Sequence, residues 1–221
     1  MEIRTGFHRE LREIQQDVLY LGSMVEKAIL RSVKALKDRD HAEAQQIITD
    51  DKTIDTLRHN IELRCVSSIA KQQPMAVDLR TLMGVTHIIT ELERIGDYAE
   101  GIAKIVLMTE DPPLQPPSSI FRMADKIADM LNRSLEAFIK QDAESARKIA
   151  LEDDEIDELY DELNRLLISY MLEDPKTITR ATHLIWVSHN LERAADRITN
   201  ICERIVFTVT GRLEEIGASR Y

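Results

Sequence analysis

The sequence predicts an all-α protein, a tandem repeat of two three-helix bundles with six long helices. Apolar residues recur at the helical spacing of three and four positions through most of the chain. Only 7 Gly and 6 Pro occur in 221 residues, and so few breakers favour long helices over many short strands. Four of the six prolines fall in residues 111–119, which predicts a stiff linker between two halves.

Three helices are predicted in the first half. The first covers about residues 5–38. Asp40 is placed to cap the second, with Glu43 completing a capping box, and this helix ends near residue 72. A proline then interrupts the pattern, and the third helix follows over about residues 78–108.

The fourth and fifth predicted helices follow the linker. Ser118 or Ser119 is placed to cap the fourth, which ends near residue 140. Asp142 opens the fifth, which is expected to continue without a break to about residue 172.

The sixth predicted helix follows a break at Asp174-Pro175. Thr177 is placed to cap it, and it ends near Thr210. The tail after Gly211 is expected to be loose, as chain ends often are.

The two halves also match each other in sequence, which indicates a duplication. Residues 51–57 (DKTIDTL) align with residues 153–159 (DDEIDEL), with four of the seven positions identical. Residues 92–97 (LERIGD) align with residues 191–196 (LERAAD), with four of six identical. The predicted units are a first repeat in residues 1–110, a linker in residues 111–119 and a second repeat in residues 120–221.

Composition excludes several classes of function. The formal net charge of −10 repels nucleic-acid phosphates, so DNA or RNA binding is not expected. The start of the chain does not read as a signal peptide, and no run of about 18 apolar residues predicts a membrane span. Cys65 and Cys202 read as buried thiols in a reducing compartment, so we expect a cytoplasmic protein.

Acidic residues recur in pairs four positions apart, two pairs in each half. Residues four apart share a helix face, where like charges repel each other, so the pattern calls for a compensating cation. The pairs are Asp51 and Asp55, Glu93 and Asp97, Asp153 and Asp157, and Glu192 and Asp196.

The spacing of these pairs predicts where they meet. The second and third helices of each half must form an antiparallel hairpin, because the turn between them is short. The two pairs of the first half lie equally far from Pro74, and those of the second half lie equally far from Asp174-Pro175. Each half thus places four carboxylates at one level, an oxygen-rich cage for one or more cations. The alternative is a solvated charged face.

We call these groups the first carboxylate band (Asp51, Asp55, Glu93, Asp97) and the second carboxylate band (Asp153, Asp157, Glu192, Asp196). Arg94 and Arg193 each follow a band glutamate and either neutralise the band or pair at the surface. His87 and His189 are either extra ligands or structural residues.

The two bands are not identical. Asn200 and Glu203 continue the face of the second band, whereas Gly101 and Lys104 hold the matching places in the first. The two sites can therefore differ in affinity or in the number of ions that they hold.

Two alternatives from other classes remain open. One is a carboxylate-bridged oxidase or metal-storage protein, but its Glu-x-x-His motif is missing in the right context, because His189 precedes Glu192. The other is a bare helical scaffold. Neither a glycine-rich phosphate loop nor a GxSxG or HExxH motif occurs, so we expect no enzyme.

These motifs resemble the PhoU family of phosphate-specific transport regulators, whose signature is an E(D)xxxD motif in each of two repeats. Here the motifs lie in ELERIGDYA, with Glu93 and Asp97, and in NLERAADRITNICE, with Glu192 and Asp196. Residues 73–80 resemble the family's QP…DLR turn, and residues 171–178 its counterpart in the second half. The similarity covers about residues 5–210, and it implies a tandem three-helix fold.

The resemblance also implies a function. PhoU proteins restrain the Pst phosphate transporter and a PhoR-type sensor kinase when phosphate is ample. The implied partners are therefore the ATPase of a phosphate ABC transporter, a phosphate sensor histidine kinase and a second copy in a homodimer. The implied cofactors at the bands are iron or zinc, with manganese or magnesium as alternatives. The implied location is the cytoplasm, peripheral to the inner membrane through these partners.

Overall fold

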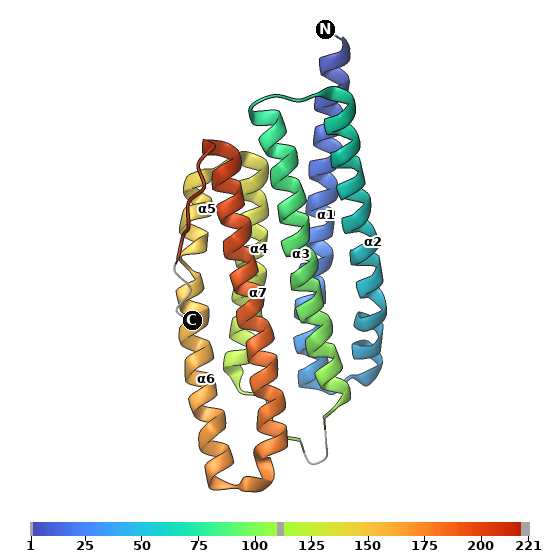
Figure 1. Ribbon diagram of the computed structural model, residues 1–221. Coiled ribbons are helices and arrows are strands. Elements are labelled where there is room, and N and C mark those ends of the chain that lie inside the picture. Colours follow the sequence, from blue (N-terminus) through green and yellow to red (C-terminus); the bar gives the residue numbers. More distant parts are fainter. Residues whose placement is uncertain (1, 110–112, 218–221) are drawn as a thin grey trace.

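The computed structural model describes residues 2–109 and 113–217, and within them every regular element is a helix (Figure 1). The long helices are α1 (Glu2–Asp38), α2 (His41–Gln72), α3 (Val77–Leu107), α4 (Ser118–Lys140), α6 (Asp153–Glu173) and α7 (Ile178–Thr210). Two short elements complete the order, α5 (Ala143–Ala150) and the 3₁₀ turn η1 (Pro175–Thr177). The predicted all-α class is confirmed. None of the described helices is long and apolar enough to cross a membrane.

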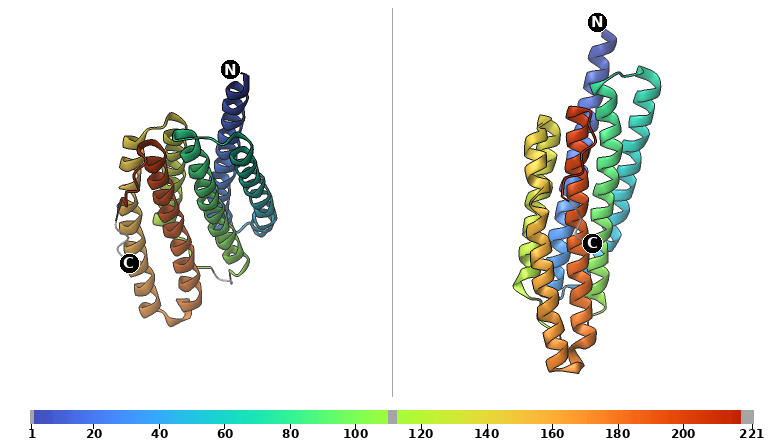
Figure 2. Two further views of the ribbon diagram at one scale, coloured as in Figure 1. Left: turned by 45° about the horizontal axis from the view of Figure 1, so that its top comes forward. Right: turned by 60° about the vertical axis from the view of Figure 1, so that its left-hand side comes forward.

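The two repeats lie side by side and point in opposite directions. Figures 1 and 2 show the α2–α3 turn at one end of the molecule and the α6–α7 turn at the other. Helices α3 and α7 pack together along the middle, and α1 packs on α4. Gly22 and Gly84 permit these close approaches, because an added Cβ would lie 2.1 Å from a Leu135 methyl and 2.4 Å from the Thr208 hydroxyl.

The apolar stripes that predicted the helices form the core. Those of α1 and α3 are almost completely buried, including Ile14, Leu21, Ile88 and Leu92. Burial also raises the pKa of the Cys65 and Cys202 thiols, both free, to about 12.

Capping by the predicted side chain is confirmed at two of the four predicted helix starts. The Asp40 and Asp142 side chains each accept a hydrogen bond from the backbone three residues on, as N-caps do. The prediction for α4 is wrong, because Pro117 is its N-cap and Ser118 already lies inside the helix. Thr177 is the N-cap residue of α7, as predicted, but its hydroxyl donates to carbonyl oxygens behind it and makes no capping hydrogen bond.

The predicted uninterrupted fifth helix is also wrong, because the chain breaks at residues 151–152 into α5 and α6. Four consecutive acidic residues follow Leu151, at positions 152–155. Carboxylates are stabilised in the first turn of a helix by the helix dipole, whereas adjacent like charges in its middle repel one another without that compensation. The matching stretch of α2 carries a lysine, Lys52, after Asp51, and that helix continues.

The tail was expected to be loose, and this is wrong as far as Gly217. Glu214 accepts two hydrogen bonds from Arg147 of α5. The Ile216 amide donates to Glu203, and its side chain packs against the core.

Candidate metal centre

The first carboxylate band lies where α2 passes α3. Asp51 is partly buried, and burial together with the charges of the other three band members and Glu100 raises its pKa to about 6. Burial and neighbouring carboxylates, Asp97 and Asp55 respectively, also raise the pKa of Glu93 and Asp97. The four predicted residues therefore lie within electrostatic reach of one another.

Sequence reasoning missed a fifth acidic group of this band. Glu100 lies one turn after Asp97 and raises the pKa of both Asp51 and Asp97. Its own carboxylate is paired with Lys104. A repeat comparison could have found it, because Glu100 occupies the place of Thr199 in the second half.

The second carboxylate band joins the start of α6 to the middle of α7. Burial, followed by the charges of Asp196, Asp157 and Glu192, raises the pKa of Asp153 to about 7. Glu192 is buried, with 6% of its surface exposed. Burial and the charge of Asp196 raise its pKa to about 7.

Arg193 neutralises the second band in part, which is one of the two roles that the sequence left open. Its side chain lies 2.9 Å from an Asp196 oxygen and 3.3 Å from a Glu192 oxygen. His189 lies at the same edge, with Nδ1 3.7 Å from Glu192. His87, the other histidine candidate, is near Arg204 of α7, which together with burial lowers its pKa.

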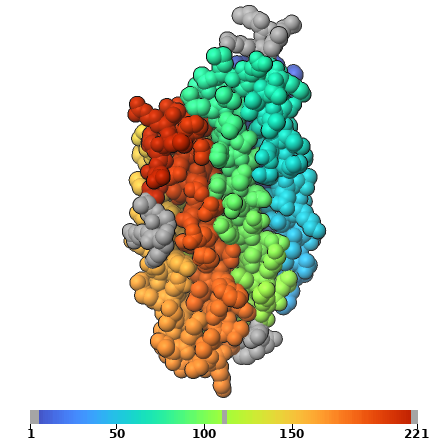
Figure 3. All heavy atoms as spheres, in the orientation of Figure 1, coloured from blue at the N-terminus to red at the C-terminus, as the bar shows by residue number. Residues whose placement is uncertain are grey.

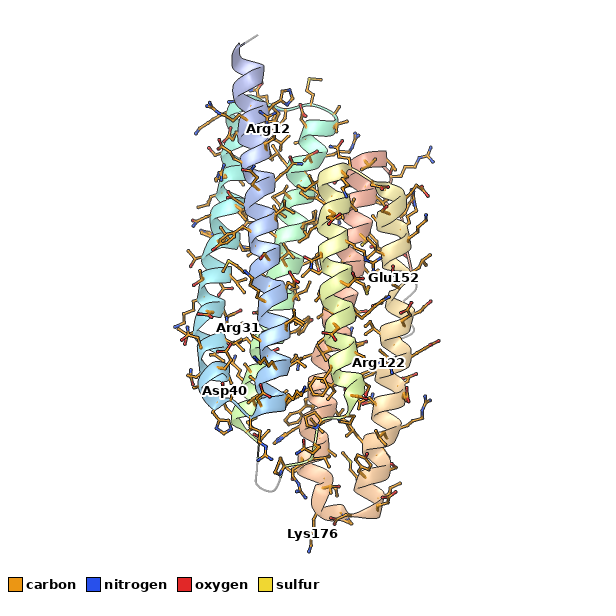
Figure 4. The ribbon with its side chains drawn as sticks, turned by 180° about the vertical axis from the view of Figure 1, so that it is seen from behind. Arg12, Arg31, Asp40, Arg122, Glu152 and Lys176 are labelled. Atoms are coloured by element: carbon orange, nitrogen blue, oxygen red, sulfur yellow. The ribbon has the colours of Figure 1, made fainter. Side chains whose placement is uncertain are left out.

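In each repeat, an arginine binds the acidic residue that precedes the first aspartate of the band, a feature that sequence reasoning missed. Arg31 of α1 donates to Asp50 at 2.7 Å, and Arg133 of α4 binds Glu152 through two nitrogens at 2.7 and 2.6 Å. Figure 4 labels Arg31 and Glu152. These pairs fix the neighbouring Asp51 and Asp153 relative to the first helix of each repeat, α1 and α4. A signal existed, because the dipeptide Arg-Ser recurs at residues 31–32 and 133–134.

The two bands are linked through the α3–α7 contact. Glu91 of α3 accepts hydrogen bonds from Asn200 at 3.2 Å and Arg197 at 3.4 Å, both on α7 next to the second band. At the opposite contact, Gly101 leaves room for Asn190. The polar link is therefore formed at one of the two equivalent α3–α7 contacts, the one beside the second band.

The donor chemistry of the bands fits a cation. Asp51 Oδ1 and Glu192 Oε2 are buried acceptor atoms without a hydrogen-bond partner, and crowded carboxylates of raised pKa are stabilised by positive charge. Carboxylate oxygens suit Mg²⁺, Mn²⁺ and iron. Within residues 2–109 and 113–217, no three His, Cys, Asp or Glu side chains are already arranged to hold one ion. The eight residues are therefore clustered, and their role as ligands stays a prediction.

Comparison with known proteins matches both repeats. A family model described as the PhoU domain covers residues 18–106 and 120–205. The chain belongs to the PhoU family. The relatives described next are named as accessory or regulatory proteins, and not as enzymes.

Several relatives cover nearly the whole chain. The accessory protein PhoU homolog of the phosphate-specific transport system from Aquifex aeolicus is 42% identical over 186 residues, 84% of each chain. PhoU of Escherichia coli is 35% identical and covers 93% of this chain and 86% of its own. The crystal structure of the regulatory protein PhoU from Streptococcus pneumoniae superposes with a TM-score of 0.89 at 35% identity, covering 94% of this chain and 99% of that one.

Proposed function

We propose that this protein is a metal-binding negative regulator of phosphate uptake and of phosphate-starvation signalling. The observation that carries the proposal is the match of residues 18–106 and 120–205 to the PhoU domain, together with relatives named as accessory proteins of the phosphate-specific transport system. The regulator acts as an adaptor, because its helices offer long exposed faces and its sequence has no catalytic motif. On the side shown in Figure 3, residues of α2, α3, α6 and α7 cover most of the surface.

The proposed metal sites are the two carboxylate bands. A bound cation supplies positive charge that offsets the mutual repulsion of each band's carboxylates. Asp51 and Asp55 would hold it from α2, and Glu93 and Asp97 from α3; the four residues of the second band would do the same for α6 and α7. The raised pKa of Asp153 to about 7 supports this assignment, because a neighbouring cation favours the charged form.

The proposed partners are the ATPase of a phosphate ABC transporter and a phosphate sensor histidine kinase, on the cytoplasmic side of the membrane. A second copy of the chain is a further partner, as a homodimer. Without metal, repulsion within the bands would loosen the α2–α3 and α6–α7 hairpins and with them the surface that partners read.

Metal content tests the sites directly. We expect gently purified protein to contain iron, zinc, manganese or magnesium, and metal addition to raise its melting temperature. The variant Asp153→Asn with Asp196→Asn should lose part of that metal. The matched control is Glu158→Gln with Glu162→Gln, two exposed glutamates four apart on the same helix α6, which should keep it all. Full metal content in the first variant would refute the second site.

Partner capture tests the regulator. The tagged protein should retain the transporter ATPase and the sensor kinase from detergent-treated membranes, and cells that lack it should express phosphate-starvation genes when phosphate is ample. Normal repression in such cells would refute the regulatory role. Oxygen consumption during Fe(II) loading would instead support the oxidase or storage alternative.

A further inference from the structure

The last described residues of the chain extend back to the second carboxylate band. Gly211 ends α7 at φ 75°, a left-handed conformation that glycine adopts without strain, and the chain then reverses. Figure 1 shows this segment running from the end of α7 past α5, and Figure 3 shows it on the outer surface. We call residues 212–217 the C-terminal strap.

The strap is held by three contacts of different kinds. Glu214 accepts hydrogen bonds from Nε and Nη2 of Arg147, both at 2.9 Å. The Ile216 amide donates to Glu203 Oε1 at 2.7 Å, and the Ile216 side chain packs on the core. The Arg147 and Glu214 side chains are 29% and 34% exposed, so solvent partly screens the ion pair.

A cavity of about 200 Å³ lies where the strap meets α7. It is lined by Asp153, Arg193, Asp196, Arg197, Thr199, Asn200, Glu203 and Gly217. Gly217 of the strap therefore shares one cavity with two carboxylates of the second band. Thr199 is only 8% exposed and its hydroxyl has no hydrogen-bond partner. This hydroxyl is therefore available to a water molecule or a small polar solute in the cavity.

The first repeat lacks the residues that would anchor such a strap. The alignment of the repeats places Gln45 where Arg147 stands, and Lys104 where Glu203 stands. A lysine ammonium cannot accept a hydrogen bond from a backbone amide. The cavity of about 180 Å³ beside Asp51 is lined by residues of α1, α2 and α3 alone.

We propose that the C-terminal strap is a gate over the second carboxylate band. Asp153 and Asp196 are partly exposed with the strap in place, and lifting of the strap widens the path of water and small solutes to them. The first band, in which Asp55 and Asp97 are exposed, exchanges with solvent directly. If the bands bind metal, the second band should take up and release metal ions more slowly than the first, and this part of the proposal rests on the proposed function. The control of solvent access to the carboxylates does not depend on metal binding.

Carboxyl labelling of the metal-free, full-length protein tests the gate. A water-soluble carbodiimide with glycinamide would label accessible carboxylates, and mass spectrometry would give the rate at each residue. Glu214→Lys sets a positive charge against Arg147. The matched control, Glu215→Lys, makes the same charge change one residue further along the strap, at an exposed side chain.

We expect Glu214→Lys to raise the labelling rates of Asp153 and Asp196 about fivefold, as loss of one solvated ion pair allows, and to leave Asp51 and Asp97 unchanged. Glu215→Lys should alter neither band. An unchanged second band, or an equal rise in both bands, would overturn the gate. Ile216→Ser, which removes the apolar anchor, should act in the same direction as Glu214→Lys.

Hydrogen exchange at the Ile216 amide shows whether the strap is closed. It should be protected in the wild type and exposed in both strap variants; an unprotected wild-type amide would overturn the proposal. For metal, Zn²⁺ release to a chelator should accelerate in Glu214→Lys when the first band is disabled by Asp51→Asn and Asp97→Asn. If neither band binds Zn²⁺, the metal proposal fails, and the labelling rates still decide the gate.

Discussion

The two carboxylate bands come from one duplicated pattern, yet the chain surrounds them differently. The first lies on the uninterrupted helix α2 and opens to solvent, and Glu100 adds a fifth carboxylate. The second lies at the start of α6, after a break, beside Arg193 and under the C-terminal strap. Accordingly the pKa of Asp51 is raised to about 6 and that of Asp153 to about 7.

A duplicated site can thus keep its four carboxylates and still change its access and charge balance. The changes lie mostly outside the signature motifs, in a helix break, a tail and a single arginine.

Loss of the second band should remove about half of the stabilisation by metal. With metal at about 100 times the dissociation constant, each occupied site stabilises the fold by about 2.7 kcal/mol. Asp153→Asn with Asp196→Asn should therefore lose about 2.7 kcal/mol of this gain, measured by thermal unfolding with and without metal. Asp51→Asn with Asp97→Asn should lose the other half. If either variant lost the entire gain, the bands would be one cooperative site.

The stability of the metal-free protein should fall as the pH rises from about 4 to about 7. Asp51, Asp153 and Glu192 have a raised pKa, so the folded chain keeps protons that the unfolded chain releases in this window. Solvent screens the partly exposed Asp51 and Asp153, so their contribution lies well below the value of about 1.4 kcal/mol per pKa unit that holds without screening.

Variants separate this slope from other titrations. The lowered pKa of His87 and His189 acts in the opposite direction near pH 6, and Arg193 and Arg197 face the second band with fixed charge. The difference between wild type and the second-band variant should extend to about pH 7, and that for the first-band variant to about pH 6. Denaturant unfolding over a range of pH measures both differences in stability. If the two differences ended at the same pH, the predicted asymmetry between the bands would be contradicted.

The ion pairs of Arg133 and Arg31 should differ in strength. Arg133→Gln should destabilise the metal-free protein by about 1–2 kcal/mol, because Glu152 loses a two-nitrogen contact and keeps only Lys126. Arg31→Gln should cost about 0.5–1 kcal/mol, since its pairs are single and part-exposed. Urea unfolding measures both. Lys140→Gln, which removes an exposed pair with Glu136, is the control and should show no measurable change.

Much of this architecture could be predicted from the sequence. Apolar spacing placed the long helices, and equal distances from the two turns placed each quartet at one level. The rest depends on contacts between distant segments. The α5–α6 break follows from an acidic run that Arg133 and Lys126 hold. The strap follows from Arg147 and Glu214, which are 67 residues apart in the chain.

The smallest expected effect concerns Gly96, which lies behind the first band where the second repeat has Ala195. An added Cβ would lie 3.4 Å from Asp51 Oδ1 and from Ile54, a tight contact that takes back part of the gain of about 1 kcal/mol from replacing a mid-helix glycine. We expect Gly96→Ala to stabilise the metal-free protein by about 0.5 kcal/mol, against a loss of about 1 kcal/mol in Ala195→Gly. Urea unfolding of both variants decides the matter. If Gly96→Ala instead lowered the free energy of unfolding, the first band would be the more tightly packed of the two, although it is more open to solvent. Only a close fit around Asp51 would require a glycine at this position.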